Sequence, residues 1–208
     1  MQRNFAITLL YFPFSVFFYL VAIASLKIYR RFEIDFKILE ENIRNTELCE
    51  EKTEFVSKLI IAEDHRFLDH FGVDFIAMAR AIYSTKIKGI FQGASTIEQQ
   101  LTRTITARYE RTLRRKLREQ LLAVLISRKF SKYLIARCYL ENAYFGHGIK
   151  GIEIALRKLD NGEYENFSEF LVSLLKYPKP KFDSDEWERK IRNRIAYIKK
   201  RYAKYCCQ

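Results

Sequence analysis

The sequence predicts a mainly α-helical protein in which one apolar N-terminal helix precedes a single folded domain. Apolar residues recur at helical spacing over most of the 208 residues, and glycines and prolines cluster between these stretches. No run of the sequence alternates apolar and polar residues as a half-buried strand does. With 49% hydrophobic and 30% charged residues, the chain can build a core and is not expected to be disordered.

The first predicted element is a membrane anchor within residues 1–31. Residues 5–26 carry no charge, and a helix of about 20 apolar residues spans the roughly 30 Å hydrocarbon layer of a bilayer. A cleaved signal peptide is the alternative, because Arg3 precedes the run and residues 22–24 have the A-x-A form. The run exceeds the apolar region of about 7–15 residues in such peptides, so we favour one transmembrane helix.

The charges that flank the anchor favour a cytoplasmic domain. Lys27, Arg30 and Arg31 follow the apolar run, whereas Arg3 and the amino terminus precede it. Lysine and arginine are enriched on the cytoplasmic side of membrane helices. Taken alone, this small bias would leave the bulk of the chain in the cytoplasm.

Behind the anchor we expect a charged helical stalk over residues 32–52 that acts as a spacer, and then a domain over residues 53–208. All seven glycines fall between the periodic stretches of this domain. The periodicity predicts about seven helices, over residues 55–62, 75–87, 96–108, 113–130, 133–144, 167–177 and 187–202.

The net charge narrows the class of partner. A formal charge of +12 favours polyanions, among them nucleic acid, anionic lipid head groups and pyrophosphates. The four cysteines (Cys49, Cys138, Cys206 and Cys207) lack the spacing of a zinc site, and they do not report the compartment.

The first candidate catalytic residue is Glu63, which directly follows the apolar run 59–62. A carboxylate at the end of a buried helix is partly desolvated and suits proton acceptance near neutral pH. The structural alternative is that Glu63 and Asp64 cap the helix or pair with Arg66. The local sequence leaves both readings open.

Two nearby histidines, His65 and His70, could be combined with Asp69 as metal ligands. Their spacing matches no common metal site. We therefore expect these residues to lie on the polar surface of a helix.

A capped helix start is the second candidate segment. Ser95 and Glu98 have the S-x-x-E spacing of a capping box, with Ser95 as N-cap and Glu98 reaching back. Gly93 lets the backbone turn tightly just before it, and the free amides of a helix start attract anions. Such a pattern by itself is mostly structural.

A dense basic segment follows. At about 100° per residue, Arg111, Arg115 and Arg118 share one helix face, and only Glu110 and Glu119 offset the cations. A solvated helix face is the structural alternative. A nucleic-acid groove is another, but aromatic residues interleave poorly here and no known motif is present, so we expect no nucleic-acid partner.

Together these segments resemble successive motifs of the peptidoglycan glycosyltransferases, the transglycosylase domain of class A penicillin-binding proteins and of monofunctional transglycosylases. Order and spacing agree over roughly residues 58–202. With one anchor and no room for a transpeptidase, the chain resembles the monofunctional type. The matching segments are Glu63-Asp64-x-x-Phe67-x-x-His70-x-Gly72-x-Asp74, Gln92-Gly93-Ala94-Ser95-Thr96-Ile97-x-Gln99-Gln100-Leu101, Arg115-Lys116-x-x-Glu119, Tyr139-Leu140, and Tyr144-Phe145-Gly146-x-Gly148-x-x-Gly151-Ile152.

The resemblance implies a lysozyme-like helical domain with a small membrane-associated lobe, held by a single pass to the cytoplasmic (inner) membrane. It places the domain in the periplasm or extracytoplasmic space, against the charge bias. The implied partners are lipid II, the growing glycan chain, the membrane and other cell-wall synthesis proteins. Residues that would suit the lobe are Ile82, Tyr83, Ile87, Ile90 and Phe91, mixed with Lys86 and Lys88.

The resemblance also implies an inverting glycosyl transfer. Glu63 matches the catalytic base, which takes the proton of the acceptor 4-hydroxyl while undecaprenyl pyrophosphate leaves. Glu119 matches the second essential carboxylate, which orients cations or holds a divalent metal, Mg²⁺ or Mn²⁺. No organic cofactor is implied. The expected substrate-binding residues are Asp64, Phe67, Ser95, Thr96, Gln99, Gln100, Arg103, Arg111, Arg115, Lys116 and Arg118.

Several residues depart from the family pattern. They leave both carboxylates intact but bear on acceptor positioning and turnover. Two alternatives therefore stay open: a non-catalytic or weakly active cell-wall scaffold, and a lytic lysozyme-like enzyme, whose alcohol leaving group has little use for clustered arginines. The departures are Ala94 for Gly, Glu98 for Thr, Arg103 for Lys, Arg137 for an acidic residue, Glu141 for Asn and His147 for Arg.

Overall fold

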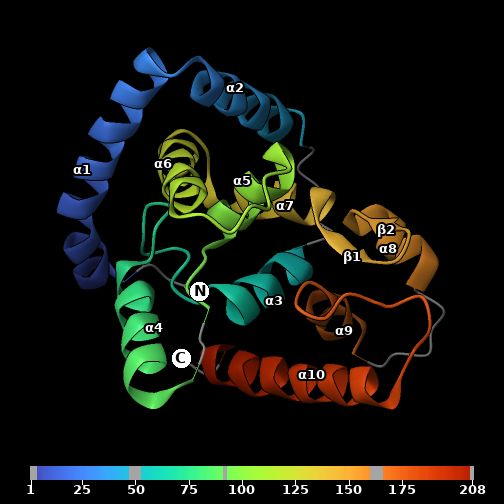
Figure 1. Cartoon of the computed structure of the whole chain (residues 1–208). Helices are drawn as coiled ribbons and strands as arrows, with labels where there is room; N and C mark the ends of the chain where they lie inside the picture. The colour runs from blue at the N-terminus through green and yellow to red at the C-terminus, as the bar shows by residue number, and fades with distance from the viewer. Residues whose placement is uncertain (1–3, 47–52, 91–92, 160–165, 207–208) are drawn as a thin grey trace.

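The structure is a computed structural model that describes residues 4–46, 53–90, 93–159 and 166–206. These residues are mainly helical, as predicted, with one short hairpin (Figure 1). The elements are α1 (Phe5–Ile28), α2 (Arg30–Arg44), α3 (Thr53–Glu63), α4 (Phe75–Lys88), α5 (Ile97–Thr106), α6 (Leu113–Lys129), α7 (Lys132–Asn142), β1 (Tyr144–Gly146), β2 (Ile149–Lys150), α8 (Ile152–Leu159), α9 (Phe167–Leu174) and α10 (Asp185–Cys206).

Helix α5 lies at the centre of the molecule and packs against both α6 and α7 (Figure 1). Helices α1 and α2 cover one side of this group, and α1 lies along α6. On the other side, α3 contacts α7, while α9 and α10 pack against α3. The C-terminal end of α3 thereby lies near both the first turn of α5 and the middle of α10.

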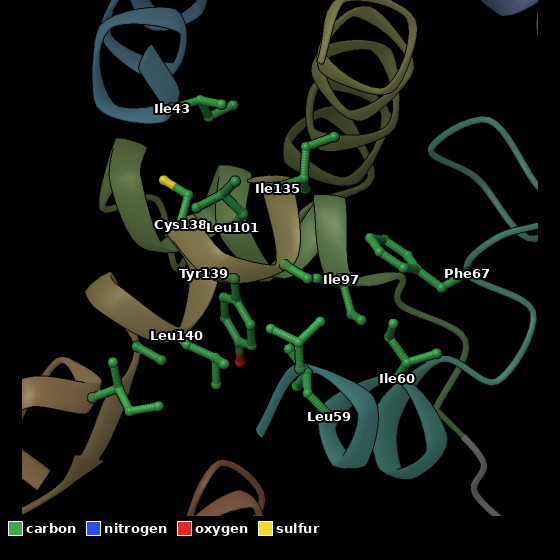
Figure 2. Close-up of a cluster of buried hydrophobic side chains, with 14 of the residues drawn as sticks. Ile43, Leu59, Ile60, Phe67, Ile97, Leu101, Ile135, Cys138, Tyr139 and Leu140 are labelled. Atoms are coloured by element: carbon green, nitrogen blue, oxygen red, sulfur yellow. The ribbon is translucent and has the colours of Figure 1, made fainter. Parts of the chain in front are cut away.

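The main core lies between α3, α5 and α7. Figure 2 shows Leu59 and Ile60 of α3 pointing toward Ile97 of α5, with the ring of Tyr139 of α7 beside them. Each of these four side chains is at most 7% exposed. Full burial of such a side chain contributes about 1.5–3 kcal/mol, so the core fixes the helix ends that carry the polar residues.

The segment after the anchor is not a spacer. Helix α2 places Phe32, Leu39 and Ile43 in the main core, each at most 3% exposed. These residues share one face of the helix, which therefore packs against the domain. The spacer expected over residues 32–52 is wrong for α2, and residues 47–52 lie outside the described part of the chain.

A β-hairpin and helix α8 follow α7, and neither was expected. The strands β1 and β2 pair antiparallel, with Tyr144 opposite Lys150. Strands of three and two residues are too short to show an alternating pattern. At Gly146, with φ +149°, an added Cβ would lie 2.5 Å from the carbonyl oxygen of Lys179, so only glycine fits.

Helix α1 is long and apolar enough to cross a membrane, with a mean hydropathy of 2.1 in its most apolar stretch. Its buried face carries polar residues. The Tyr11 hydroxyl donates to Asp74 Oδ1 at 2.5 Å, and Arg128 of α6 donates to Ser15 Oγ at 2.8 Å. The opposite face exposes large apolar side chains such as Phe5, which is 79% exposed.

Residues 64–74 form turns and are not the exposed helix surface expected around the two histidines. His70 is fully buried, and its Nε2 lies 2.9 Å from Asp64 Oδ2. Asp74 ends the segment as the N-cap of α4, where its side chain accepts from the Ala77 amide.

Gly72 joins this loop to two helices. It has φ +89°, and an added Cβ would lie 2.4 Å from the carbonyl oxygen of Ala123 in α6. Its own carbonyl accepts a hydrogen bond from the Thr96 hydroxyl, at 2.8 Å, just before α5 begins. The loop, α5 and α6 therefore meet at a residue that must lack a side chain.

Helix α4 and the segment directly after it expose the apolar residues expected in a membrane-associated lobe. Ile82, Tyr83, Ile87 and Ile90 are between 53% and 66% exposed. Phe91 lies outside the described residues. The insertion of this lobe into a membrane stays a prediction.

Candidate active site

Glu63 is the last residue of α3, and its side chain is 16% exposed. Arg194 of α10 donates to Glu63 Oε1 at 2.7 Å and also to the Ala62 carbonyl. Gln100 of α5 donates to Glu63 Oε2 at 3.3 Å. The structure therefore combines both readings of Glu63, an ion-paired helix end and an accessible carboxylate.

Arg194 is a site residue that sequence reasoning missed. It lies 131 positions from Glu63 along the chain, and no motif or spacing connects the two. Its side chain is 10% exposed, and its Nε has no hydrogen-bond partner among the described residues. The only sequence signal was the basic character of the last helix.

Glu119 lies on α6 with 2% of its surface exposed, among three cations. Arg103 Nε donates to its Oε1 at 2.9 Å, Arg115 donates to the same oxygen, and Lys116 Nζ lies 3.8 Å from Oε2. The hydrogen bond to Glu119 raises the pKa of Arg103. One carboxylate thus holds three positive groups together.

Lys116 connects Glu119 to the start of α5. Its ammonium donates to Ser95 Oγ at 3.0 Å and to the Gln99 side-chain oxygen. Burial lowers the pKa of Lys116 to about 8, although the charge of Glu119 acts to raise it; Arg103 and Arg115 lower it further by smaller amounts. This lysine is therefore close to losing its charge under mildly alkaline conditions.

The expected capping box is wrong in its details. Thr96, not Ser95, is the N-cap of α5, and its hydroxyl accepts from the Gln99 amide at 3.3 Å. Glu98 does not reach back; it is fully buried and accepts from Lys132 at the start of α7. Ser95 is left free of the cap and faces Lys116.

Several predicted substrate-binding residues lie away from the two carboxylates. Phe67 is fully buried in the core, and Asp64 is buried behind Glu63, where it accepts from the Ile97 amide. Arg118 donates to Asp35 of α2 at 2.8 Å instead of facing Glu119. Arg111 lies in the exposed segment before α6.

Asp64, His70 and Glu98 form a group whose potential metal-ligand atoms lie within 4.8 Å of one another. His70 Nδ1 is 4.0 Å from Glu98 Oε1, and both Nδ1 and Glu98 Oε2 lack hydrogen-bond partners among the described residues. However, the Lys132 ammonium already binds Glu98, and it lies 4.5 Å from the Phe67 ring centroid. A divalent cation would meet this charge in a closed interior, so the group does not fit a metal.

Without a bound substrate, the groups around Glu119 offer Mg²⁺ or Mn²⁺ a single carboxylate. These ions take several oxygen ligands, and Mg²⁺ is usually held by one or two carboxylates together with substrate phosphates. The groups in contact with Glu119 are two guanidiniums and an ammonium, which would repel a metal ion.

Two hollows flank the segment at Ser95, which lines both. The larger is a cleft of about 740 Å³, whose lining includes Gln100, Arg103, Tyr109, Tyr139, Tyr144 and Lys150. The smaller is lined by Glu63, His65, Asp74 and Arg80, among others. Gln100 and Arg103, three residues apart on α5, touch Glu63 and Glu119 respectively. Both carboxylates therefore border the same helix face.

The family model and the relatives that match this chain point to the same protein family. The family model described as Transglycosylase matches residues 36–203. The chain is 43% identical to penicillin-binding protein 1A of Aquifex aeolicus over 48% of this chain and 14% of that protein. It is 36% identical to penicillin-binding protein 1F of Bacillus subtilis over 52% and 15%, respectively. It is 30% identical to penicillin-binding protein 1A of Rickettsia typhi over 69% and 19%.

The chain thus spans less than a fifth of the length of these relatives. The match to the family model begins at residue 36, within the segment expected to be a stalk, in agreement with the packing of α2 on the domain.

Proposed function

The chain belongs to the transglycosylase family, and from this premise we propose that it is a peptidoglycan glycosyltransferase that polymerises lipid II into glycan strands. The observation that carries the proposal is the pair of carboxylates on one face of α5. Glu63 is held by Gln100 and Glu119 by Arg103, and both α5 residues line the large cleft. We take residues 1–31 as the anchor and residues 53–208, with α2 packed on them, as the glycosyltransferase domain.

Glu63 is the proposed general base. Its Oε1 is fixed by Arg194, and among the described residues its Oε2 has only the long contact to the Gln100 amide. An incoming GlcNAc 4-hydroxyl would displace this amide and donate its proton to Oε2. The electron pair left on the hydroxyl oxygen then forms the bond to the MurNAc anomeric carbon. Because the attack comes from the side opposite the pyrophosphate, the configuration at this carbon inverts.

The leaving group is undecaprenyl pyrophosphate, which departs with the electron pair of the broken carbon–oxygen bond. It is already a stable anion, so it needs positive charge more than a proton donor. Arg103, Arg115 and Lys116 would supply that charge, and guanidinium groups suit bidentate contact with phosphate oxygens. Glu119, which binds all three, is the proposed positioning carboxylate.

No step needs a metal ion in this scheme. The guanidiniums of Arg103 and Arg115 lie around Glu119 where a divalent ion would bind. The Lys132 ammonium forms an ion pair with Glu98. Arginine and lysine supply the charge neutralisation in this scheme, and the comparison with and without a chelator tests whether a divalent metal adds to it.

The two hollows suggest how the substrates divide. Tyr109 and Tyr144 are 65% and 56% exposed at the large cleft, and aromatic rings there would stack on sugar faces of the growing strand. The small hollow offers Arg80 to the pyrophosphate of the acceptor lipid. His65, also in its lining, has its pKa lowered to about 4 by burial and by Arg66, so it is neutral at pH 7.

One experiment separates the proposed activity from the two alternatives. The purified full-length chain is incubated in detergent with lipid II and, separately, with finished glycan, in buffer with and without a chelator. A glycosyltransferase lengthens lipid II into polymer and leaves finished glycan intact. Shortened glycan would instead identify a lytic enzyme, and no change in either substrate would identify a scaffold.

A further inference from the structure

The last two turns of α10 carry cations without acidic neighbours. The sequence from Arg189 to Gln208 contains no aspartate or glutamate. In the first half of the helix, Lys190 pairs with Glu186 at 2.6 Å and Arg192 with Glu188 at 3.3 Å. Positive charge is therefore offset at the start of the helix and uncompensated toward its end.

Three exposed lysines near the end of α10 carry this uncompensated positive charge. Ile191 and Ile198 are buried against the domain. Arg194 donates to Glu63, and Arg201 donates to two tyrosine hydroxyls of the same helix. Lys199, Lys200 and Lys204 are exposed, and none of them has an acidic partner within 4 Å in the part of the chain that the structure describes. At about 100° per residue they fall within an arc of about 140°.

The end of α10 lies close to α4. In Figure 1 the C-terminal end of α10 is drawn beside the lower half of α4. The charges of Arg201 on α10 and Arg80 on α4 both lower the pKa of His65, and Arg80 and His65 line the same small hollow. Helix α4 contains no acidic residue, and its Lys86 and Lys88 are exposed among the apolar side chains described above.

We propose that Lys199, Lys200 and Lys204 of α10, with Lys86 and Lys88 of α4, form a basic edge that binds anionic phospholipid head groups. Exposed apolar residues flanked by lysines are the composition of membrane-surface helices. Each such lysine near an anionic bilayer strengthens binding about fivefold, within a Debye length of about 8–10 Å.

A bilayer fits this surface better than a soluble polyanion does. The exposed isoleucines of α4 would have no role with nucleic acid or with another charged polymer, whereas they can enter the acyl region. Helix α1, apolar enough to cross a membrane, would keep a bilayer within reach. This inference does not depend on the glycosyltransferase reaction.

The test uses the full chain in nanodiscs made either of phosphatidylcholine alone or of equal parts of phosphatidylcholine and phosphatidylglycerol. The four cysteines are replaced by serine, and exposed Ala203, which lies between Lys200 and Lys204, is replaced by a cysteine carrying a fluorophore. Lipids with a spin-labelled head group quench the fluorophore on contact. We expect quenching at least tenfold stronger in the anionic discs, and we expect 1 M salt, with its Debye length of about 3 Å, to abolish the difference.

A matched pair of variants locates the binding surface. Replacing Lys199, Lys200 and Lys204 together by glutamine should reduce quenching in anionic discs to the level in neutral discs. Replacing Arg189, Lys190 and Arg192 by glutamine removes the same charge from the same helix and should leave it unchanged. Circular dichroism melting confirms that both variants are folded.

Three results would overturn the proposal. They are equal quenching in the two lipids, equal loss in both triple variants, and complete loss of the additional quenching in anionic discs when inorganic polyphosphate is added. The last result would identify the edge as a site for soluble polyanions.

Discussion

At the scale of single residues, the proposed reaction rests on the different surroundings of two carboxylates. Glu63 has one arginine and one amide, whereas Glu119 has two guanidiniums and an ammonium. The first arrangement leaves an oxygen with room to take a proton. The second leaves none, but it fixes the positions of three cations.

We therefore expect Glu63→Gln to reduce lipid II polymerisation by about 10²–10⁴-fold, because the amide cannot accept the proton of the 4-hydroxyl. Binding of lipid II should be largely retained, as measured by ligand titration. Glu119→Gln is the comparison: it should weaken binding of the pyrophosphate donor as well as turnover. Polymerisation by Glu63→Gln at near the wild-type rate would remove Glu63 from the role of base.

The lowered pKa of Lys116 predicts that the rate of polymerisation depends on pH. Its pKa of about 8 lies below the usual value for lysine, so the ammonium loses its proton as the pH rises through about 8. The neutral amine no longer stabilises the leaving pyrophosphate. We expect kcat/KM to fall on an alkaline limb near pH 8, and Lys116→Arg, which stays charged, to move this limb upward. An identical limb in wild type and Lys116→Arg would assign the titration to another group.

The buried pair of Glu98 and Lys132 predicts a large effect on stability. Glu98 is fully buried, so Lys132→Met leaves an uncompensated charge in the interior, at a cost of about 3–5 kcal/mol. The melting temperature should fall by several degrees, measured by circular dichroism. Lys190→Met, in an exposed pair on α10, is the control, and it should cost about 1 kcal/mol or less. Adding Glu98→Gln to Lys132→Met should restore part of the loss, and its failure to do so would exclude the charge as the cause.

At the scale of helices, the sequence predicted those with strong periodicity well. The stretch expected at 113–130 is α6 over Leu113–Lys129, and that expected at 75–87 is α4 over Phe75–Lys88. The hairpin and α8 escaped prediction because each is short and depends on close packing, as at Gly146. Local patterns carry no information on such contacts.

The same limit applies to the candidate site. Ser95, Gln99, Lys116 and Glu119 lie close together because Ser95 just precedes α5, Gln99 is in its first turn, and α5 packs directly against α6, which carries Lys116 and Glu119. The choice between Ser95 and Thr96 as N-cap depended on Lys116, which comes from another helix, so spacing could not decide it.

Helix α2 gives a prediction at this scale. Its buried Asp35 accepts from both Arg108 and Arg118, at 3.0 and 2.8 Å. Asp35→Asn should destabilise the protein by about 1–3 kcal/mol and increase amide hydrogen exchange over residues 30–44. Glu33→Gln, which breaks an exposed pair with Lys37 on the same helix, should do neither. Unchanged exchange in Asp35→Asn would mean that the apolar face alone holds α2.

At the scale of the whole molecule, two features disagree on the side of the membrane on which the domain lies. The charges after the anchor favour the cytoplasm, whereas the proposed use of lipid II places the domain outside it. The proposed function requires the second arrangement, with α1 as a single-pass anchor.

We expect a reporter that is active only outside the cytoplasm, fused after Gln208, to be active in cells. Changing Lys27, Arg30 and Arg31 to glutamine removes the opposing charge bias and should not lower that signal. Activity from a reporter that works only in the cytoplasm would contradict the proposed use of lipid II.

Gly72 has a consequence for how mutations in this protein would be interpreted. The space for its missing side chain is filled by the backbone of α6 at Ala123, one helical turn beyond Glu119, and its carbonyl holds the start of α5. A larger residue at position 72 would push the half of the site with Glu63 away from the half with Glu119. A mutational scan would then score position 72 as intolerant as a catalytic residue, although glycine has no side chain that could react. Intolerance in this fold therefore measures the alignment of the two halves as much as the chemistry.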